Sequence, residues 1–148
     1  AYPHKRPQIR LIPFREDQLV MICNPTHPLA SHKTISVKKL EGQNFVGFEK
    51  DIPTHKAIDK VLQKHHVRVN YVAEVDNIEV IKRIVEVGTG ISIAPAPAVG
   101  PEIRAKSLVA IPFSDEHFLR QLGIIHKEGR HFSPAAEKFI DTLTPGEI

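Results

Sequence analysis

Cysteine and long apolar runs are almost absent from this 148-residue chain. Cys23 is the only cysteine, so no internal disulfide can form, and its place in the apolar run Leu19–Cys23 predicts a buried strand residue rather than a reactive thiol. No apolar stretch approaches the ~20 residues of a membrane-spanning helix, and Ala1–Arg6 lacks the apolar core of a secretory signal. We therefore expect a cytosolic protein without membrane contact.

Blocks of one charge are also missing. The chain has 20 Lys and Arg residues against 17 Asp and Glu residues, a formal net charge of +3, and no basic block longer than His4-Lys5-Arg6. Since no aromatic residues are interleaved with basic ones, the sequence does not support nucleic-acid contact by this chain itself. A mild positive field is compatible with the capture of a small anion.

Motifs of catalytic and metal sites are not found either. His65 and His66 are adjacent and belong to no His-x3-His pair, which predicts a solvated pair at a helix end. Ser92 lies in G-I-S-I-A, which lacks the second glycine of a nucleophile elbow. Gly88 and Gly90 follow a helix rather than open one, so they predict a structural turn and not a phosphate loop. We expect no enzyme activity, no metal and no cofactor.

The stretch 75–97 is the most informative part of the sequence. Asp76 and Glu79 have the spacing of a capping box, which predicts a helix that begins at Asn77. A glycine turn then leads into the short apolar strand Ile91–Ala94. This order is typical of the second half of a βαβ unit.

The helix within this stretch has two faces. Its apolar stripe consists of Ile78, Ile81, Ile84 and Val85. Its polar side consists of Glu79, Lys82, Arg83 and Glu86. We expect Glu79 to pair with Arg83 at i,i+4 spacing on the solvent side.

Strands and helices alternate along the chain with short loops, which predicts an α/β fold with parallel strands and crossover helices. The expected strands are 9–12, 19–23, 44–48, 69–75, 91–94, 107–111 and 119–126. The expected helices are a single turn at 36–40 capped by Ser36, a helix from an Asp51 cap to His66, the helix from Asn77, and a helix over 133–143. The prolines at 95, 97 and 101 predict a short connector.

Four blocks of the sequence resemble the C-terminal effector-binding domain of LysR-type transcriptional regulators. They are LVMICNPTHPLA (Leu19–Ala30), ISVKKLEG (Ile35–Gly42), IEVIKRIVEVGTGISIAP (Ile78–Pro95) and FSPAAEKFIDTL (Phe132–Leu143). Their order and spacing extend through nearly the whole chain. The resemblance implies a type II periplasmic-binding-protein-like fold, in which two α/β lobes with mixed sheets are joined by two crossing strands and hold a small metabolite between them.

The resemblance also implies how the chain is divided. Residues 1–23 would be the remainder of the first lobe and the first crossing strand, 24–106 the second lobe, and 107–148 the return crossing and the C-terminal part of the first lobe. Members of the family carry a helix-turn-helix domain, a linker helix and the opening half of the first lobe before the equivalent of Ala1. We therefore expect an N-terminally truncated fragment with an incomplete first lobe, whose exposed sheet edges favour pairing with another copy.

The function implied by the resemblance is effector sensing. The domain would bind a small polar or anionic metabolite and modulate DNA binding by a helix-turn-helix domain absent from this chain, in a dimeric or tetrameric full-length protein. A solute-binding protein of a transport system shares the architecture and is the alternative. An enzyme on the same fold is a third hypothesis, which a paired nucleophile and base at the cleft would support.

Three loops at the carboxyl ends of strands are the expected ligand site. They are Glu49–Thr54, Asp76–Asn77 and Pro95–Ala96. The candidate ligand-binding residues are Thr54, Asp76, Asn77, Pro95 and Thr89. For Asp76 the alternative role is helix capping, and for Thr54 it is a purely structural one.

Overall fold

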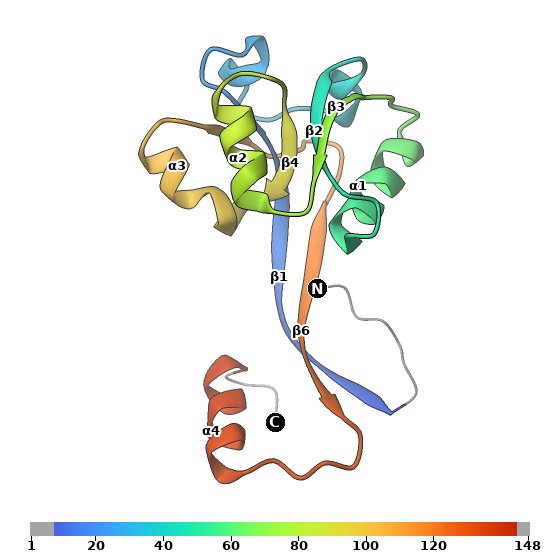
Figure 1. Ribbon diagram of the computed structural model, residues 1–148, viewed down its shortest axis with the longest axis vertical. Helices are drawn as coiled ribbons and strands as arrows, with labels where there is room; N and C mark the ends of the chain where they lie inside the picture. Colours follow the sequence, from blue (N-terminus) through green and yellow to red (C-terminus); the bar gives the residue numbers. More distant parts are fainter. Residues whose placement is uncertain (1–7, 145–148) are drawn as a thin grey trace. The chain divides into compact units, whose positions relative to one another are not determined.

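A computed structural model describes residues 8–144, with the elements labelled in Figure 1. The strands are β1 (Ile9–Cys23), β2 (Asn44–Phe48), β3 (Asn70–Val75), β4 (Ser92–Pro95), β5 (Val109–Ile111) and β6 (Leu119–Lys127). The α-helices are α1 (Pro53–Lys64), α2 (Ile78–Glu86), α3 (Gly100–Arg104) and α4 (Pro134–Leu143), and the 3-10 helices are η1 (Pro28–Ser31), η2 (Val37–Leu40) and η3 (Ala96–Val99). The order β2-α1-β3-α2-β4 confirms the predicted alternation.

The strands form a mixed arrangement around β4. β2 pairs in parallel with β3, and a parallel bridge between Phe45 and Ile91 sets the start of β4 beside β2. The amide of Val46 donates to the carbonyl of Ile91 at 2.8 Å and supports this bridge. β1 pairs antiparallel with both β4 and β5, and β6 also pairs with β1. The neighbouring strands are thus β3-β2-β4-β1-β5.

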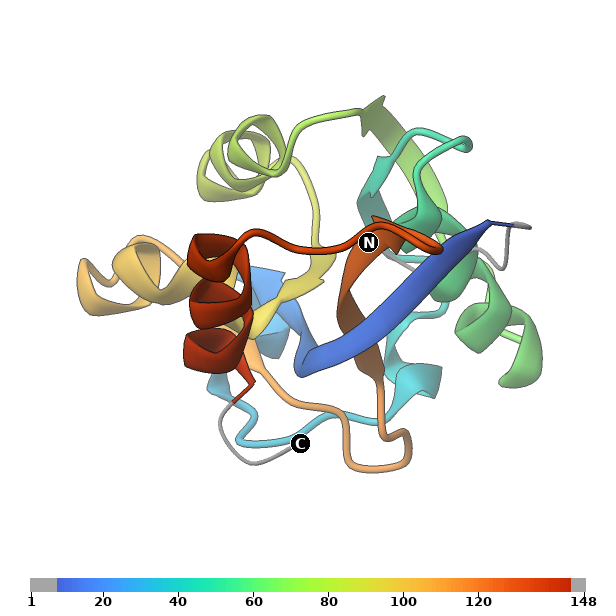
Figure 2. The same cartoon turned by 90° about the horizontal axis from the view of Figure 1, so that it is seen from below.

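Helices α1 and α2 lie on opposite sides of β2, as Figure 1 and the turned view in Figure 2 show. The strand order explains this placement. The chain steps outward from β2 to β3 through α1, and it steps back past β2 to β4 through α2. Right-handed crossovers in opposite directions put the two helices on opposite faces of the sheet.

β1 is a single strand of 15 residues, so the prediction that its first part ends before Pro13 is wrong. Pro13 is exposed, and a proline is tolerated in a strand where its missing N–H would face solvent. The second part of β1, Leu19–Cys23, is buried throughout, as its unbroken apolar run predicts. Cys23 is fully buried there, which confirms its predicted structural place.

Several predicted helix boundaries need correction. The connector expected at 95–101 contains η3 and α3, because Pro97 and Pro101 lie in first turns that need no backbone donor. Pro53 lies in the first turn of α1 as predicted, but the N-cap is Ile52 and not Asp51, so the helix begins one residue later than expected. The Ser36 side chain makes no capping hydrogen bond before η2.

The glycine turn after α2 has the predicted structural role. Gly88 has a φ of +82°, the left-handed conformation that commonly follows the end of a helix. A Cβ at Gly90 would lie 2.5 Å from the carbonyl oxygen of Asn44. A side chain at Gly90 would therefore push the start of β4 away from β2.

The chain divides into two compact units. Residues 17–120 form the larger one, which we call the central unit, and 1–16 with 121–148 form the terminal unit. In the terminal unit, the Ser133 hydroxyl accepts from the Ala136 amide at 3.3 Å and confirms the predicted start of α4. No residue of α4 is buried, and 64% of Phe139 is exposed. Within residues 8–144, no helix combines the length and the hydrophobicity needed to cross a membrane.

Candidate functional site

The last residues of β2, β3 and β4 lie at one edge of the central unit's sheet, because these three strands run in the same direction. We call this edge, with the loops Glu49–Ile52, Asp76–Asn77 and Pro95–Ala96, the carboxyl edge. Helices α1 and α2 begin there. Their N-terminal N–H groups and the positive ends of their dipoles attract an anion.

Asn77, and not Asp76, caps helix α2. The Asn77 Oδ1 atom accepts from the amide of Glu79 at 2.8 Å, so the helix begins at Ile78, one residue later than predicted. The predicted capping box is therefore wrong, and capping is excluded as the role of Asp76. The exposed Asp76 carboxylate makes no hydrogen bond or ion pair with any residue in the range 8–144. It is left with its acceptor oxygens facing solvent.

Thr54 lies in the first turn of α1 and is 5% exposed. Its hydroxyl makes no hydrogen bond within the described part of the chain, yet it is not among the side-chain atoms sealed from solvent. Pro53 has no N–H, and the His55 amide donates to the carbonyl of Ile52 at 3.0 Å. Because the Ile52 side chain offers no acceptor, the Thr54 amide is the first-turn N–H group left to water or a ligand. A buried hydroxyl beside a helix N-terminus is suited to bind an anionic group.

His55 fixes the loop that leads into α1. It is 7% exposed, and its Nδ1 atom lies 2.6 Å from the carbonyl oxygen of Phe48. Its ring stacks on the ring of Tyr71, with centroids 5.8 Å apart. Burial and then the charges of Asp59 and Glu74 raise the pKa of Tyr71 to about 12, so the phenol stays neutral. The end of β2 is thus joined rigidly to the first turn of α1.

Pro95 and Thr89 lie at opposite ends of β4. Pro95 is buried at the last position of the strand, opposite Leu19 of β1, and it leads into η3. Thr89 is exposed in the turn that precedes the strand. The fold therefore brings Thr54, Asp76 and Asn77 to the same edge as Pro95, but not Thr89. The sequence carries the reason, since Thr89 comes before a strand and the others follow one.

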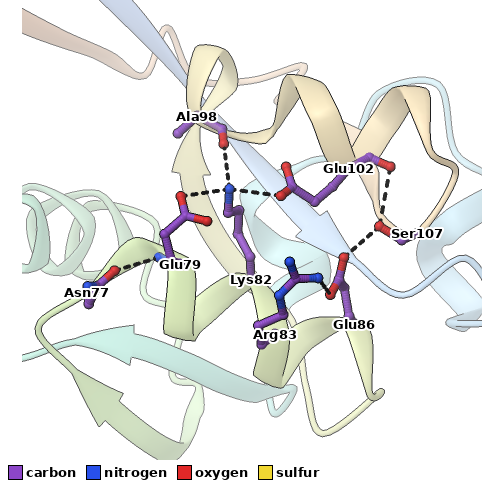
Figure 3. Close-up of polar contacts among 8 residues, drawn as sticks. All are labelled: Asn77, Glu79, Lys82, Arg83, Glu86, Ala98, Glu102 and Ser107. Atoms are coloured by element: carbon purple, nitrogen blue, oxygen red, sulfur yellow. Dashed lines mark hydrogen bonds and ion pairs between the residues drawn. The ribbon is translucent and has the colours of Figure 1, made fainter.

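Lys82 is the residue that sequence reasoning missed. It was expected on the solvent side of α2 but is 4% exposed, and its Nζ atom meets three acceptors (Figure 3). It donates to Glu79 Oε1 at 2.8 Å, to Glu102 Oε1 at 2.9 Å and to the carbonyl oxygen of Ala98 at 3.1 Å. Lys82 follows Ile78 by four residues, and this spacing puts both on the same face of a helix. The spacing was therefore a signal in the sequence that Lys82 lies on the apolar face of α2.

The charges around Lys82 stabilise one another. Burial alone would lower the pKa of Lys82, but the hydrogen bonds to Glu79 and Glu102 outweigh it, so its pKa is raised. The hydrogen bond from Lys82 is the main cause that lowers the pKa of Glu102. Both groups are therefore charged at neutral pH, and each neutralises the other's buried charge, although the second carboxylate oxygen of Glu102, Oε2, has no hydrogen-bond partner within the described part of the chain.

Arg83 belongs to a second group of contacts on α2. Its guanidinium pairs with Glu86 at 2.7 Å and not with Glu79, so the predicted i,i+4 pair is wrong. Glu86 also accepts from the Ser107 hydroxyl at 2.6 Å (Figure 3). The hydrogen bonds from Ser107 and then Arg83 lower the pKa of Glu86. Glu79 is drawn instead toward Lys82, which lies closer to the core.

Two residues considered for chemistry have structural partners. The Ser92 side chain is fully buried and donates to the carbonyl of Val46 at 2.6 Å, so its hydroxyl is not available as a nucleophile. His65 is not solvated as predicted, because its Nε2 atom lies 2.8 Å from Glu116 Oε2. Across residues 8–144, no group of three or more His, Cys, Asp or Glu side chains is arranged to hold a metal ion.

Comparison with known proteins gives a family and several relatives. The sequence model of the family described as LysR substrate binding domain matches residues 1–146. A "Probable RuBisCO transcriptional regulator" of Synechocystis sp. is 29% identical over 140 residues, which cover 93% of this chain and 41% of that protein. A "RuBisCO operon transcriptional regulator" of Allochromatium vinosum is 26% identical over 137 residues, covering 93% and 45%. The chain spans less than half the length of these relatives.

Solved structures show the same fold. The regulatory domain of Synechocystis PCC6803 CcmR in complex with 2-PG has a TM-score of 0.86 and 25% identity over 97% of this chain and 69% of that one. The effector binding domain of QuiR in complex with shikimate has a TM-score of 0.83 and 20% identity, over 95% and 66%. The BenM effector binding domain with its effector benzoate has a TM-score of 0.77 and 18% identity, over 95% of this chain and 64% of that one. These similarities confirm the predicted fold class.

Proposed function

Because this chain belongs to the family of LysR substrate-binding domains, we propose that it is the effector-sensing part of a LysR-type transcriptional regulator. Its carboxyl edge would form one wall of the effector site. The observation that carries this proposal is the convergence of Thr54, Asp76, Asn77 and Pro95 at the carboxyl edge, where α1, α2 and η3 begin. The central unit would then correspond to the second lobe of the family's fold.

The ligand class follows from the groups at this edge. Two helix N-termini and the Thr54 hydroxyl favour an anionic group. The Asp76 carboxylate only accepts hydrogen bonds, so it favours a ligand that also carries an O–H or N–H donor. Benzoate and shikimate, the ligands named for two of the similar structures, are small carboxylates. We propose a small anionic metabolite with at least one hydroxyl or amino group as the effector.

The rest of the proposal concerns the whole regulator. This chain spans less than half the length of the relatives that it matches. Effector binding would favour one arrangement of a homodimer or tetramer over another. The readout would be DNA binding by a helix-turn-helix domain elsewhere in that cytosolic protein. The relatives are transcriptional regulators, and we propose that this chain is likewise a regulator and not an enzyme.

Titration of the intact protein tests the effector site. Thermal-shift and calorimetric titrations with 2-PG, shikimate, benzoate and inorganic phosphate should identify at least one stabilising anion. The Thr54→Val variant should weaken its binding about tenfold, or roughly 1.4 kcal/mol, because one hydrogen bond to a charged group is lost. The Asp76→Asn variant should alter the preference between ligands with and without a hydroxyl group.

The control for these variants is Thr34→Val, which removes an exposed threonine hydroxyl outside the carboxyl edge. It should bind as the wild type does. If none of the four anions stabilises the intact protein, or if Thr54→Val and Asp76→Asn both titrate like Thr34→Val, the effector site is not at this edge.

A further inference from the structure

The Lys82 ammonium is the point where three elements of the central unit meet (Figure 3). Glu79 comes from the first turn of α2, Ala98 from η3 and Glu102 from α3. An ammonium group has three N–H donors, and each of these donors has one acceptor. No donor of this buried group is left unpaired.

We propose that Lys82 is a positioning residue that holds two of the three loops of the carboxyl edge in their ligand-binding arrangement. This inference rests on the proposed function and deepens it, because it assigns a role at the effector site to a residue that does not lie in any of its loops. The two loops are Asp76–Asn77, which leads into α2, and Pro95–Ala96, which leads into η3.

The link to the first loop passes through Glu79. The backbone amide of Glu79 donates to the Asn77 side chain, and the Glu79 carboxylate accepts from Lys82. Lys82 therefore restrains the same turn that the Asn77 cap closes. A change in the position of the Lys82 ammonium would alter the direction in which Asn77 and the preceding Asp76 face the edge.

The link to the second loop is the hydrogen bond from Lys82 to the carbonyl of Ala98. Ala98 lies three residues after Pro95, within the single turn of η3. In the described part of the chain, this is the hydrogen bond that joins η3 to α2. Glu102 fixes the ammonium from the far side, and its side chain is only 10% exposed. The two loops are thus set relative to each other by one cation.

A purely stabilising role would not need this arrangement. A buried ion pair can often be replaced by apolar residues of similar volume without loss of stability, whereas removal of one partner leaves an uncompensated charge. The double variant Lys82→Met with Glu102→Gln removes the ammonium and the buried carboxylate charge together. Because no uncompensated buried charge remains, the double variant should keep the stability of the fold and lose only the restraint on the loops.

Hydrogen exchange of the intact protein measures that placement without a ligand. In the double variant, the amides at 77–79 and those of Ala96, Ala98 and Val99 should exchange about tenfold faster, while those of β2 and β4 stay within about threefold of the wild type. Lys82→Arg keeps a charged donor and should restore slow exchange at both loops. Arg83→Met is the matched control, because it removes the neighbouring cation of α2, which is exposed and pairs with Glu86.

Titration with 2-PG, shikimate, benzoate and inorganic phosphate completes the test. For whichever anion the wild type binds, the double variant should show about a tenfold higher Kd, Lys82→Arg a largely restored Kd, and Arg83→Met no change. Uniform exchange changes across residues 17–120, or unchanged exchange at both loops, would overturn the positioning role. A wild type that binds none of these anions would overturn the proposed effector site instead, and the exchange data would still decide whether Lys82 orders the two loops.

Discussion

The Nδ1 atom of His55 lies 2.6 Å from the carbonyl oxygen of Phe48, so a residue of α1 closes the loop that leads into its own helix. Because a carbonyl oxygen only accepts, Nδ1 carries the proton, and Nε2 faces Asp59 at 3.7 Å. The bond is buried between the end of β2 and the first turn of α1. This buried hydrogen bond restrains the Glu49–Ile52 loop of the carboxyl edge.

Replacement of His55 tests this restraint. His55→Leu should lower the free energy of unfolding by about 1–3 kcal/mol, because the Phe48 carbonyl loses a buried donor. His55→Asn should recover part of this loss, since its amide nitrogen lies near the position of Nδ1. Urea denaturation measures both, with the exposed His117→Gln as control. Equal stability of His55→Leu and His117→Gln would contradict a restraining role for His55.

Stability should fall in acid through Glu102. Its pKa is lowered in the folded protein, so its charged form stabilises the fold above the ordinary value of 4.5, and this contribution is lost as the pH falls through the folded pKa. Glu102→Gln should therefore be less stable than the wild type at about pH 7, and the difference should narrow below about pH 4.5. Urea denaturation across this range measures it, with the exposed Asp141→Asn as control. A difference that does not depend on pH would refute the Glu102 contribution.

The ion pairs of Glu116 should stabilise the fold more than an ion pair between two exposed side chains does. It accepts from Lys64 and from His65, both at 2.8 Å, and these bonds lower its pKa. Glu116→Gln should cost about 1–2 kcal/mol at neutral pH, because the Glu116 side chain is 13% exposed and the bonds are charge-assisted.

The matched control is Glu128→Gln. Glu128 pairs with Arg10, but the two side chains are 49% and 66% exposed, so its loss should cost no more than about 0.5 kcal/mol. Thermal and urea unfolding compare the two variants. If Glu128→Gln proves as costly as Glu116→Gln, burial is not what strengthens the Glu116 contacts.

Cys23 should react with thiol reagents only when the protein unfolds. It is fully buried, and burial raises its pKa to about 11, so the thiolate is scarce at neutral pH. An aromatic disulfide reagent should label the native protein at least about a hundredfold more slowly than the urea-unfolded protein. The control is Cys23→Ala combined with Ser31→Cys, which moves the thiol to an exposed position. Rapid labelling of the native wild type would show that this part of β1 opens.

The sequence predicted the elements of the central unit well, because hydrophobic periodicity and helix signals are local. Single residues at helix starts were less predictable. Asp76 and Asn77 are both good capping residues, and only the backbone conformation decides between them. The helix at 100–104 was missed because prolines mark both connectors and first turns.

Lys82 shows what local patterns cannot reveal. Its position on α2 is compatible with an exposed lysine until α3 brings Glu102 against it. The partner lies 20 positions later in a helix that the sequence did not predict. The position of Thr54, Asp76, Asn77 and Pro95 at the carboxyl edge was easier to predict, because the direction of parallel strands follows from the βαβ order alone. Thr89 was grouped with them although it precedes its strand.

The ion pair between Asp17 and Arg120 brings the two ends of the central unit together. These two residues are the first and last of the central unit, and their side chains are joined at 3.0 Å. The unit's own beginning and end are therefore neighbours in space, as they are in modules that nature inserts into the loops of unrelated proteins. A gene segment encoding 17–120 could therefore be inserted into a loop of a host protein through two short linkers, without a long gap between the two insertion points.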